Sequence, residues 1–225
     1  MFHYFLFWAG PVIILATLPL RKDPEKRWQD AVTVIGFTVY LSIATEVHLV
    51  LLRSTPQTLD VALLRADRAL GFDVFAFGEA IGRHRLVTNI LAIGYTLLSA
   101  VIGLAWIAEQ NRTLRRAMLL AGCGCFVFYA AFPAVGPGHY DWRALAPEAI
   151  VPRNCMPSMH LTWAFLLAIN ARSRWLAAAL WFYAAIIAVS TVALGEHYLI
   201  DLIAAVPYTV AAQWVARKIT PERMT

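Results

Sequence analysis

Long apolar runs, separated by short charged stretches, dominate the hydropathy pattern of this chain. A helix needs about 20 apolar residues to cross about 30 Å of hydrocarbon. Runs of this kind predict seven spans, at residues 2–20, 29–52, 86–108, 117–134, 158–171, 175–195 and 197–216. The fifth run has only 14 residues, so one of its ends should lie below the membrane surface. The pattern predicts an all-α, polytopic transmembrane helix bundle of about six to seven spans.

A different pattern fills residues 57–85, where apolar and charged positions alternate at roughly helical spacing. A segment of this kind is typical of amphipathic helices that lie flat in the membrane interface. We expect it at the outer interface. It is either an ordinary connector or a lid and lipid-entry ramp beside the site.

Composition agrees with a membrane protein. Of 225 residues, 60% are apolar and 15% are charged, whereas soluble domains are about 45–50% apolar and about 25% charged. The net charge of +5 is spread in short runs between apolar blocks, which argues against nucleic acid as a partner and for the bilayer. We expect residues 1–225 to form a single integral membrane domain, with its catalytic half at about 117–216. The oligomeric state is left open.

Orientation follows from the basic residues of the short loops, which collect in the cytoplasm. One side carries 12 of the 19 Lys and Arg residues, on loops at 21–27, 112–116, 172–174 and 217–223. This predicts an outer N-terminus and a cytoplasmic C-terminus. The first run is expected to stay uncleaved, because Arg21-Lys22 follows it instead of a small-residue cleavage site. A bacterial inner membrane with a periplasmic site fits best, although a Golgi lumen would show the same topology.

Polar residues at the start of the fifth run form the first candidate site, Arg153-Asn154-Cys155-Met156-Pro157-Ser158-Met159-His160. Pro157 is expected at the first position of a helix, which proline favours. The free N–H groups near Ser158 to His160, with the helix dipole, would then bind an anion. The Ser158 hydroxyl, Arg153 and His160 can reach the same anion. The alternative is a capped helix start with a solvated histidine.

The second candidate site is the stretch Gly195-Glu196-His197-Tyr198-Leu199-Ile200-Asp201, between the sixth and seventh runs. His197 and Asp201 stand at i and i+4, which predicts one face of the seventh helix. The carboxylate can fix the imidazole tautomer and leave the other nitrogen free to attack. The alternatives are a structural His–Asp pair or a zinc site, which the spacing does not support, so we predict no metal. Cys155, alone on the outer loop, predicts no disulfide and carries no sign of an activated thiol.

Both turns are predicted at one membrane face, and together they suit metal-free phosphoryl transfer on a membrane lipid, with no cofactor. His197 would attack phosphorus and form a phosphohistidine, with Asp201 stabilising the charged ring. His160 would protonate the leaving oxygen and then activate the acceptor. The helix N–H groups and Ser158 would bind the developing charge.

These residues resemble the type 2 phosphatidic acid phosphatase superfamily. Residues 157–160 match its Pro-Ser-x-His motif, and His197 with Asp201 matches its His-x-x-x-Asp motif. The resemblance implies that His197 is the nucleophile, Asp201 its partner and His160 the general acid. It covers the last three runs closely and the fourth loosely.

Two departures from the phosphatase pattern favour another branch. The Lys-x6-Arg-Pro motif is missing, and Ser190-Thr191 stands where the phosphatases have Ser-Arg. The stretch beginning Tyr129-Ala130-Ala131-Phe132-Pro133 looks more like inositol phosphorylceramide synthases, which transfer a phospho-headgroup between lipids. That likeness implies an inositolphosphotransferase activity.

With two basic ligands missing, other residues are expected to bind the phosphate or the substrate. The candidates are Arg153, Arg143, Tyr129 and, more weakly, His139, although solvation on the outer face would also explain the arginines. Glu46 and His48, inside the second run, either line a polar cavity or pair with each other or with neighbouring helices.

Three other functions remain open. A lipid phosphate phosphatase would differ only in that water attacks the phosphohistidine. A serine hydrolase using Ser158 lacks the Gly-x-Ser-x-Gly elbow. A proton-coupled transporter relaying protons through His160, His197 and Asp201 would be favoured by internal repeats, which the sequence does not show.

Overall fold

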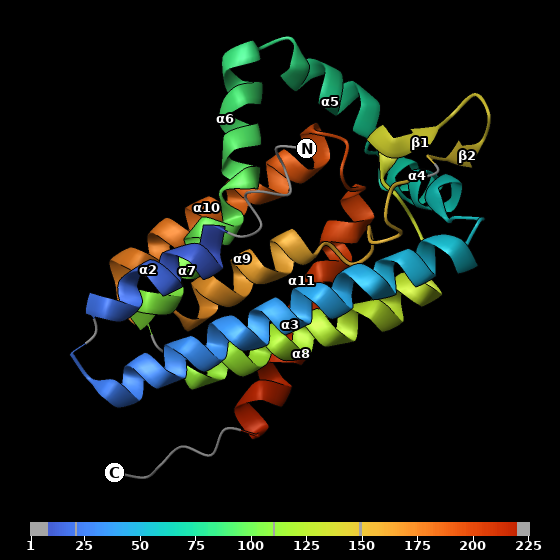
Figure 1. Ribbon diagram of the computed structural model, residues 1–225. Helices are drawn as coiled ribbons and strands as arrows, with labels where there is room; N and C mark the ends of the chain where they lie inside the picture. Colours follow the sequence, from blue (N-terminus) through green and yellow to red (C-terminus); the bar gives the residue numbers. More distant parts are fainter. Residues whose placement is uncertain (1–8, 21, 110, 149, 220–225) are drawn as a thin grey trace.

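The computed structural model describes residues 9–20, 22–109, 111–148 and 150–219, which form a bundle of α-helices (Figure 1). The helices are α2 (Ala9–Thr17), α3 (Pro24–Ser54), α4 (Asp60–Ala69), α5 (Val74–Gly82), α6 (Arg85–Thr96), α7 (Leu98–Glu109), α8 (Arg112–Ala131), α9 (Met159–Asn170), α10 (Arg174–Ala193) and α11 (Leu199–Lys218). Two 3-10 turns, η1 (Leu18–Leu20) and η2 (Pro137–His139), and an antiparallel pair, β1 (Tyr140–Asp141) and β2 (Ala146–Pro147), complete the described chain. The all-α prediction is confirmed.

Four of these helices are long and apolar enough to cross a membrane: Arg27–Ser54, α8, α10 and α11. The predicted third span is a pair of helices, α6 and α7, bent by 47° at a break, which would make a fifth. Helix α9 has 12 residues, about 18 Å at 1.5 Å per residue, so it is too short to cross alone. The described residues of the first run form a shorter apolar helix, Pro11–Leu20, which is not among these candidate spans. The count of seven is therefore not confirmed.

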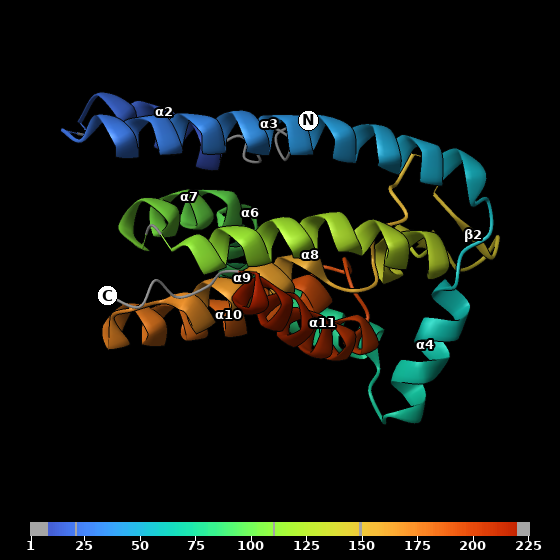
Figure 2. The ribbon, with the colours of Figure 1, turned by 90° about the horizontal axis from the view of Figure 1, so that it is seen from below.

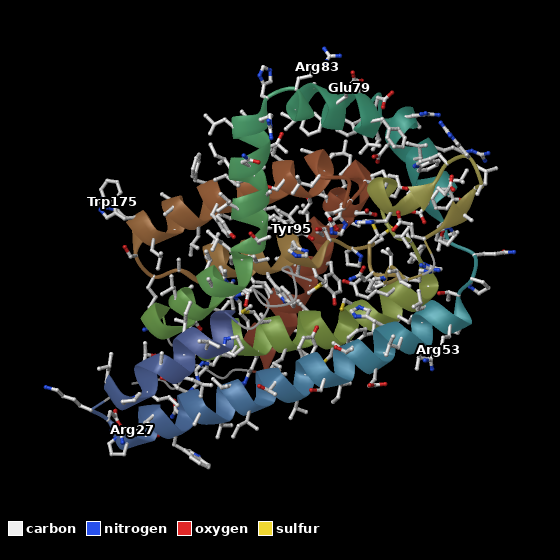
Figure 3. The ribbon with its side chains drawn as sticks, turned by 45° about the horizontal axis from the view of Figure 1, so that its top comes forward. Arg27, Arg53, Glu79, Arg83, Tyr95 and Trp175 are labelled. Atoms are coloured by element: carbon white, nitrogen blue, oxygen red, sulfur yellow. The ribbon has the colours of Figure 1, made fainter. Side chains whose placement is uncertain are left out.

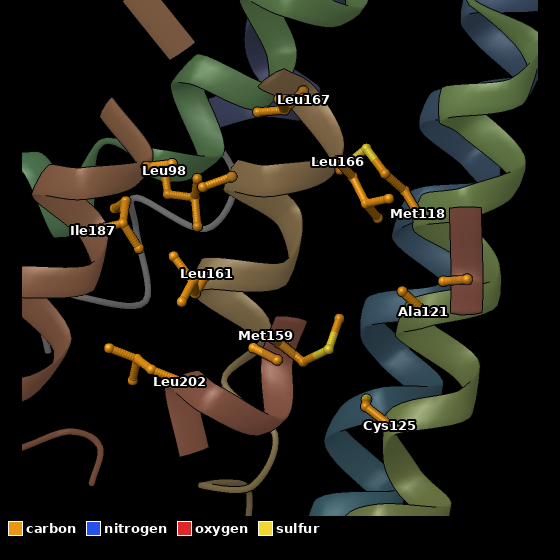
Figure 4. Close-up of a cluster of buried hydrophobic side chains, with 14 of the residues drawn as sticks. Leu98, Met118, Ala121, Cys125, Met159, Leu161, Leu166, Leu167, Ile187 and Leu202 are labelled. Atoms are coloured by element: carbon orange, nitrogen blue, oxygen red, sulfur yellow. The ribbon is translucent and has the colours of Figure 1, made fainter. Parts of the chain in front are cut away.

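Helix α9 lies in the middle of the bundle and contacts α7, α8, α10 and α11. It carries no Asp, Glu, Lys or Arg, as expected of a helix surrounded by others. Figure 4 shows the resulting core, in which Leu161 and Leu166 of α9 lie among Ile187 of α10, Met118 of α8 and Leu202 of α11. A short helix is stable here because neighbours cover it on several sides.

Glycines let two helix pairs approach closely, as small residues do in membrane bundles. A Cβ on Gly94 of α6 would lie 2.8 Å from the Ile186 side chain of α10, and the Tyr183 hydroxyl donates to the Gly94 carbonyl at 2.6 Å. On α8, a Cβ on Gly122 would lie 2.8 Å from the Tyr40 hydroxyl. The first contact brings α6, and Tyr95 with it, over the centre of the bundle.

The loops that carry the two candidate motifs meet at one end of the bundle. The Gly138 N–H donates to the Gly195 carbonyl at 2.8 Å. At the other end, Asn170 of α9 and Gln213 of α11 exchange two side-chain hydrogen bonds of 2.9 and 3.0 Å. The predicted meeting of the two motifs is confirmed, and a buried amide pair fixes the opposite end.

The segment at 57–85 folds as two short helices, α4 and α5, with α4 across the motif end of the bundle (Figure 2). Asp60 and Asp67 of α4 are fully buried. The predicted position of this segment in the membrane interface stays a prediction, but two of the α4 carboxylates face the protein instead of water. These two aspartates point into the protein because backbone N–H groups of other segments bind them.

Candidate active site

His197 and Asp201 lie together in a tight turn that leads into α11. Nδ1 of His197 is 3.5 Å from Oδ2 of Asp201, and both side chains are buried. Helix α11 begins at Leu199, with Tyr198 as its N-cap, so His197 precedes the helix instead of sharing a face of it, as was predicted. The pair still forms, because Asp201 turns back over the helix start and accepts the Tyr198 N–H at 2.8 Å.

Cys155 is the third member of this cluster, and the sequence prediction missed it. Its thiol donates to Oδ2 of Asp201 at 2.8 Å and lies 3.4 Å from Nδ1 of His197. Burial, together with the charge of Asp201, raises the pKa of Cys155 well above its usual value, so the thiol keeps its proton at neutral pH. The one sequence signal for a place of Cys155 in the site is its position, three residues before Ser158 in the first candidate site.

One oxygen of the Asp201 carboxylate has no hydrogen-bond partner in the described part of the chain. This atom, Oδ1, is buried, and a buried acceptor left unpaired costs free energy. The cluster can therefore accept one more donor or a cation.

His160, in the first turn of α9, stacks on Tyr95 of α6. The ring centroids are 4.2 Å apart at an interplanar angle of 23°, and the Tyr95 hydroxyl is 3.4 Å from Nδ1 of His160. Figure 3 shows Tyr95 in the interior, away from peripheral residues such as Arg53 and Trp175. Nothing in the sequence singles out Tyr95, which is one aromatic residue of an apolar run.

The imidazoles of His160 and His197 face each other with centroids 6.3 Å apart and planes at 65°. At this separation one phosphoryl group can contact both rings. The two motif histidines are therefore close enough for one bound group to contact both.

Helix α9 begins two residues later than predicted. Helix α9 begins at Met159, and Ser158 is its N-cap, with the Ser158 hydroxyl accepting the Leu161 N–H at 3.5 Å. Pro157 therefore precedes the cap. The Ser158 N–H donates to the Asp201 carbonyl at 3.3 Å, which ties the two motifs together. In the described structure, the N–H groups of Met159 and His160 have no protein acceptor, as is usual for a first helical turn, and such groups bind anions.

The first turn of α11 is already occupied by an anion of the protein itself. Asp67 accepts the N–H groups of Leu199 and Ile200 at 2.8 and 2.9 Å. Its carboxylate takes the place that a phosphate would need. Between these two helix starts, only that of α9 remains available for a substrate anion.

Asp60 holds the loop before the first motif. It accepts the Tyr198 hydroxyl at 2.9 Å and the Gly136 N–H at 3.0 Å. Burial raises the pKa of Asp60, and these hydrogen bonds oppose the rise. Like Asp67, Asp60 lies outside the two motifs. A single carboxylate in an amphipathic segment does not indicate a role in supporting the site, so the sequence analysis did not identify it.

Glycines dock this loop on the His197 turn. Gly136 has a φ of +92°, and a Cβ there would lie 2.3 Å from the Glu196 carbonyl oxygen. Gly195 has a φ of +76°, and its Cβ would meet Gly138 at 3.0 Å. A side chain at Gly136 would push the loop off the turn that carries His197.

His139, predicted as a substrate ligand, lies beside the turn that carries Glu196 and His197. Its Nε2 is 3.4 Å from Oε1 of Glu196, and its Nδ1 is 3.9 Å from Oε2 of Glu148. The hydrogen bond that His139 donates to the Glu196 carboxylate raises the pKa of His139 against the effect of burial. Burial acts to raise the pKa of Glu196, but the three nearby histidines hold it below its usual value.

The other predicted substrate ligands lie elsewhere. Arg153 is buried and donates to the carbonyls of Thr55, Glu148 and Val151 at 3.4, 3.1 and 2.6 Å, so its guanidinium fastens the loop. Arg143 is exposed in the turn between β1 and β2. Tyr129 is buried on α8. Among the described contacts, none joins these three residues to His160 or His197, so their role in substrate binding stays a prediction.

The residues at the position of the missing arginine hold the backbone. The Thr191 carbonyl accepts the N–H groups of Glu196 and His197 at 2.9 and 3.0 Å, and the Ser190 hydroxyl lies within hydrogen-bond distance of the Leu91 carbonyl. Thr191 thus positions the turn that carries His197.

Glu46 and His48 of the second run do not pair with each other in the described structure. Glu46 is exposed, and His48 packs edge-on against Phe126 at 5.5 Å and near Tyr129 at 5.8 Å.

Comparisons with known proteins agree with this geometry. Neither the curated proteins nor the solved structures contain a match to the chain. A family model described as PAP2 superfamily matches residues 61–215, which is more than half of the chain and includes His160, His197 and Asp201. The chain therefore belongs to the PAP2 superfamily, whose members act as phosphatases or phosphotransferases, and its apolar helices make it a membrane protein.

Proposed function

We propose that the protein is a membrane lipid phosphotransferase that works through a phosphohistidine. It would transfer a phospho-headgroup from a phospholipid to an alcohol acceptor, as inositol phosphorylceramide synthases do. The observation that carries this proposal is the pair of facing imidazoles, 6.3 Å apart, with Asp201 beside one of them.

In the first step, Nε2 of His197 attacks phosphorus and the bond from phosphorus to the diacylglycerol oxygen breaks. Asp201 stabilises the positive charge that develops on the ring. His160, packed between Tyr95 and His197, takes up a second proton only together with the phosphate anion of the substrate, and it then gives that proton to the leaving oxygen. Stacking on Tyr95 keeps the His160 ring in place for this transfer.

In the second step, His160 takes the proton of the acceptor hydroxyl, and the acceptor oxygen attacks the phosphohistidine. The bond between phosphorus and Nε2 breaks, so His197 returns to its starting state and His160 to an imidazolium. The developing charge on the phosphoryl oxygens would be bound by the free N–H groups of Met159 and His160, since donors aimed at that charge lower the barrier.

Transfer is favoured over hydrolysis by one feature of the sequence. Thr191 stands where the phosphatases carry an arginine, so a free phosphate product would lack that ligand. The lipid phosphate phosphatase remains the alternative, since it needs only water in place of the alcohol.

Activity can be tested with purified protein in detergent, a phospholipid labelled in its headgroup, and either no acceptor, inositol or a lipid alcohol. We expect labelled transfer product only when an acceptor is present, and its loss in His197→Ala. His84→Ala is the matched control, because His84 is exposed. Free headgroup phosphate released without acceptor would identify a phosphatase, and normal turnover in His197→Ala would exclude the phosphohistidine.

We also propose that the motif end faces the outside of the plasma membrane and that the C-terminus is cytoplasmic. The basic loops support this orientation. Leu145→Cys, at a 65% exposed position between β1 and β2, should react with a membrane-impermeant maleimide in intact cells. Reaction only after lysis would reverse the orientation.

A further inference from the structure

We propose that Cys155, His197 and Asp201 also bind a zinc-like divalent cation and that this cation switches the enzyme off. The inhibitory effect rests on the proposed function, whereas cation binding does not. In the described part of the chain, these three residues form a group whose possible ligand atoms all lie within 4.8 Å of one another.

The spacing of the three ligand atoms is close to that of a tetrahedral site. Zinc bonds of about 2.0–2.3 Å place tetrahedral ligand atoms about 3.3–3.6 Å apart. Nδ1 of His197 is 3.4 Å from the Cys155 sulfur and 3.5 Å from Oδ2 of Asp201. The sulfur and Oδ2 are 2.8 Å apart because a thiol proton joins them, so this edge opens by about 0.7 Å when a cation replaces that proton.

The chemistry of the ligands selects the cation. Thiolate, imidazole and carboxylate together suit zinc, whereas magnesium and calcium prefer oxygen ligands alone. The buried and unpartnered Oδ1 of Asp201 offers a second oxygen to the same ion. A water or a phosphate oxygen can complete the coordination.

Binding would block the nucleophile through the imidazole tautomer. A cation on Nδ1 requires the lone pair of that nitrogen, so the ring proton moves to Nε2. Nε2 is the atom that attacks phosphorus, and a protonated nitrogen cannot attack. The balance is one cation bound and the Cys155 thiol proton released to solvent.

Cobalt(II) reports such a site directly, since a thiolate ligand gives a charge-transfer band and tetrahedral geometry gives intense visible bands. The test uses the full chain, freed of metal by a chelator, with Cys123→Ala and Cys125→Ala so that Cys155 is the one thiol left. We expect one equivalent of cobalt to produce both bands and zinc to remove them. Cys155→Ser in the same background should show neither, and if it does not fold, Cys155→Ala replaces it.

Inhibition is measured as the ratio of turnover with and without zinc for each variant. We expect zinc to lower the ratio at least tenfold in the protein that keeps Cys155, and to leave it near one in Cys155→Ser, with magnesium having no effect in either. Absence of the cobalt bands, or equal bands in Cys155→Ser, would overturn the site. Cobalt bands in a protein that shows no turnover on any lipid would leave the site intact and count against the proposed function instead.

Discussion

The phenol of Tyr95 covers the imidazole of His160, with ring centroids 4.2 Å apart and the hydroxyl 3.4 Å from Nδ1. Tyr95 comes from α6, outside both motifs, and reaches α9 because Gly94 lets α6 approach α10. The general acid proposed here is thus oriented by a residue 65 positions away along the chain.

Removing the Tyr95 hydroxyl should lower kcat more than it changes KM. A hydrogen bond contributes about 1 kcal/mol, so we expect Tyr95→Phe to lower kcat about fivefold. Tyr95→Leu should lose more, because it also removes the stacked ring. Tyr183→Phe is the control, since its hydroxyl bonds the Gly94 carbonyl. Steady-state kinetics check this, and equal losses in Tyr95→Phe and Tyr183→Phe would argue for a purely structural role.

Replacing Asp67 should weaken the start of α11 and displace Asp201 with it. Asp67→Asn removes the charge from two hydrogen bonds to backbone N–H groups, each worth about 1.5–3 kcal/mol when charged. We expect a fall in the thermal midpoint in detergent and a loss of activity. Asp73→Ala is a matched control, because Asp73 caps α5 locally and is exposed. It should cost about 1 kcal/mol of stability and leave the catalytic rate unchanged.

Gly136→Ala should abolish activity, because its Cβ would lie 2.3 Å from the Glu196 carbonyl oxygen, next to His197. Gly71→Ala separates this clash from backbone strain, since Gly71 also has a positive φ, of +76°, but nothing within 4 Å of a new Cβ. Strain alone costs about 1–2 kcal/mol. Comparable activity losses in the two variants, measured by headgroup transfer, would show that the clash is relieved.

The contact between His139 and Glu196 should stabilise the protein within a window of mildly acid pH. The pKa of His139 is raised, so its contribution is complete below its ordinary value of 6.5 and is lost as the pH rises through its folded value. The pKa of Glu196 is lowered, so its contribution is complete above 4.5 and is lost as the pH falls through its folded value. The contribution is therefore greatest between pH 4.5 and 6.5.

Thermal midpoints measured across pH check this window. The difference between the unmodified protein and Glu196→Gln should peak inside it and shrink on either side. A difference that keeps growing above pH 7 would mean that the pair does not carry the effect.

Local patterns were enough to predict the helical class and both motif turns. Apolar runs identify helices, and the residues of a short motif lie close in space wherever the chain turns tightly, as His197 and Asp201 do. The details of the turn were harder, since the helix start moved past Pro157 in one motif and past His197 in the other. Helix boundaries depend on which side chain caps the first turn, and here Ser158 and Asp201 do so.

Residues that support the site from a distance could not be predicted from one sequence. Tyr95, Asp60 and Asp67 have ordinary neighbours along the chain, and their roles come from contacts made across 65 to 138 residues. The count of seven spans is not confirmed, in part because hydropathy does not distinguish a lipid-facing helix from α9, which other helices surround. Arg153 was expected at the phosphate, but the carbonyls of its own loop and of Thr55 bind it.

From the contact of the Asp67 carboxylate with the start of α11 we also expect an order of folding. Asp67 is synthesised more than 130 residues before the N–H groups that it accepts. The Asp67 carboxylate, which is buried in the folded protein, therefore lacks these two hydrogen bonds until the last helix has entered the membrane. Formation of the site is then coupled to completion of the chain, because a nascent protein that lacks α11 has no partner for this charge. A fragment restricted to residues 117–216 would fail to form the site for the opposite reason. It would contain the start of α11 but not the Asp67 carboxylate that binds it.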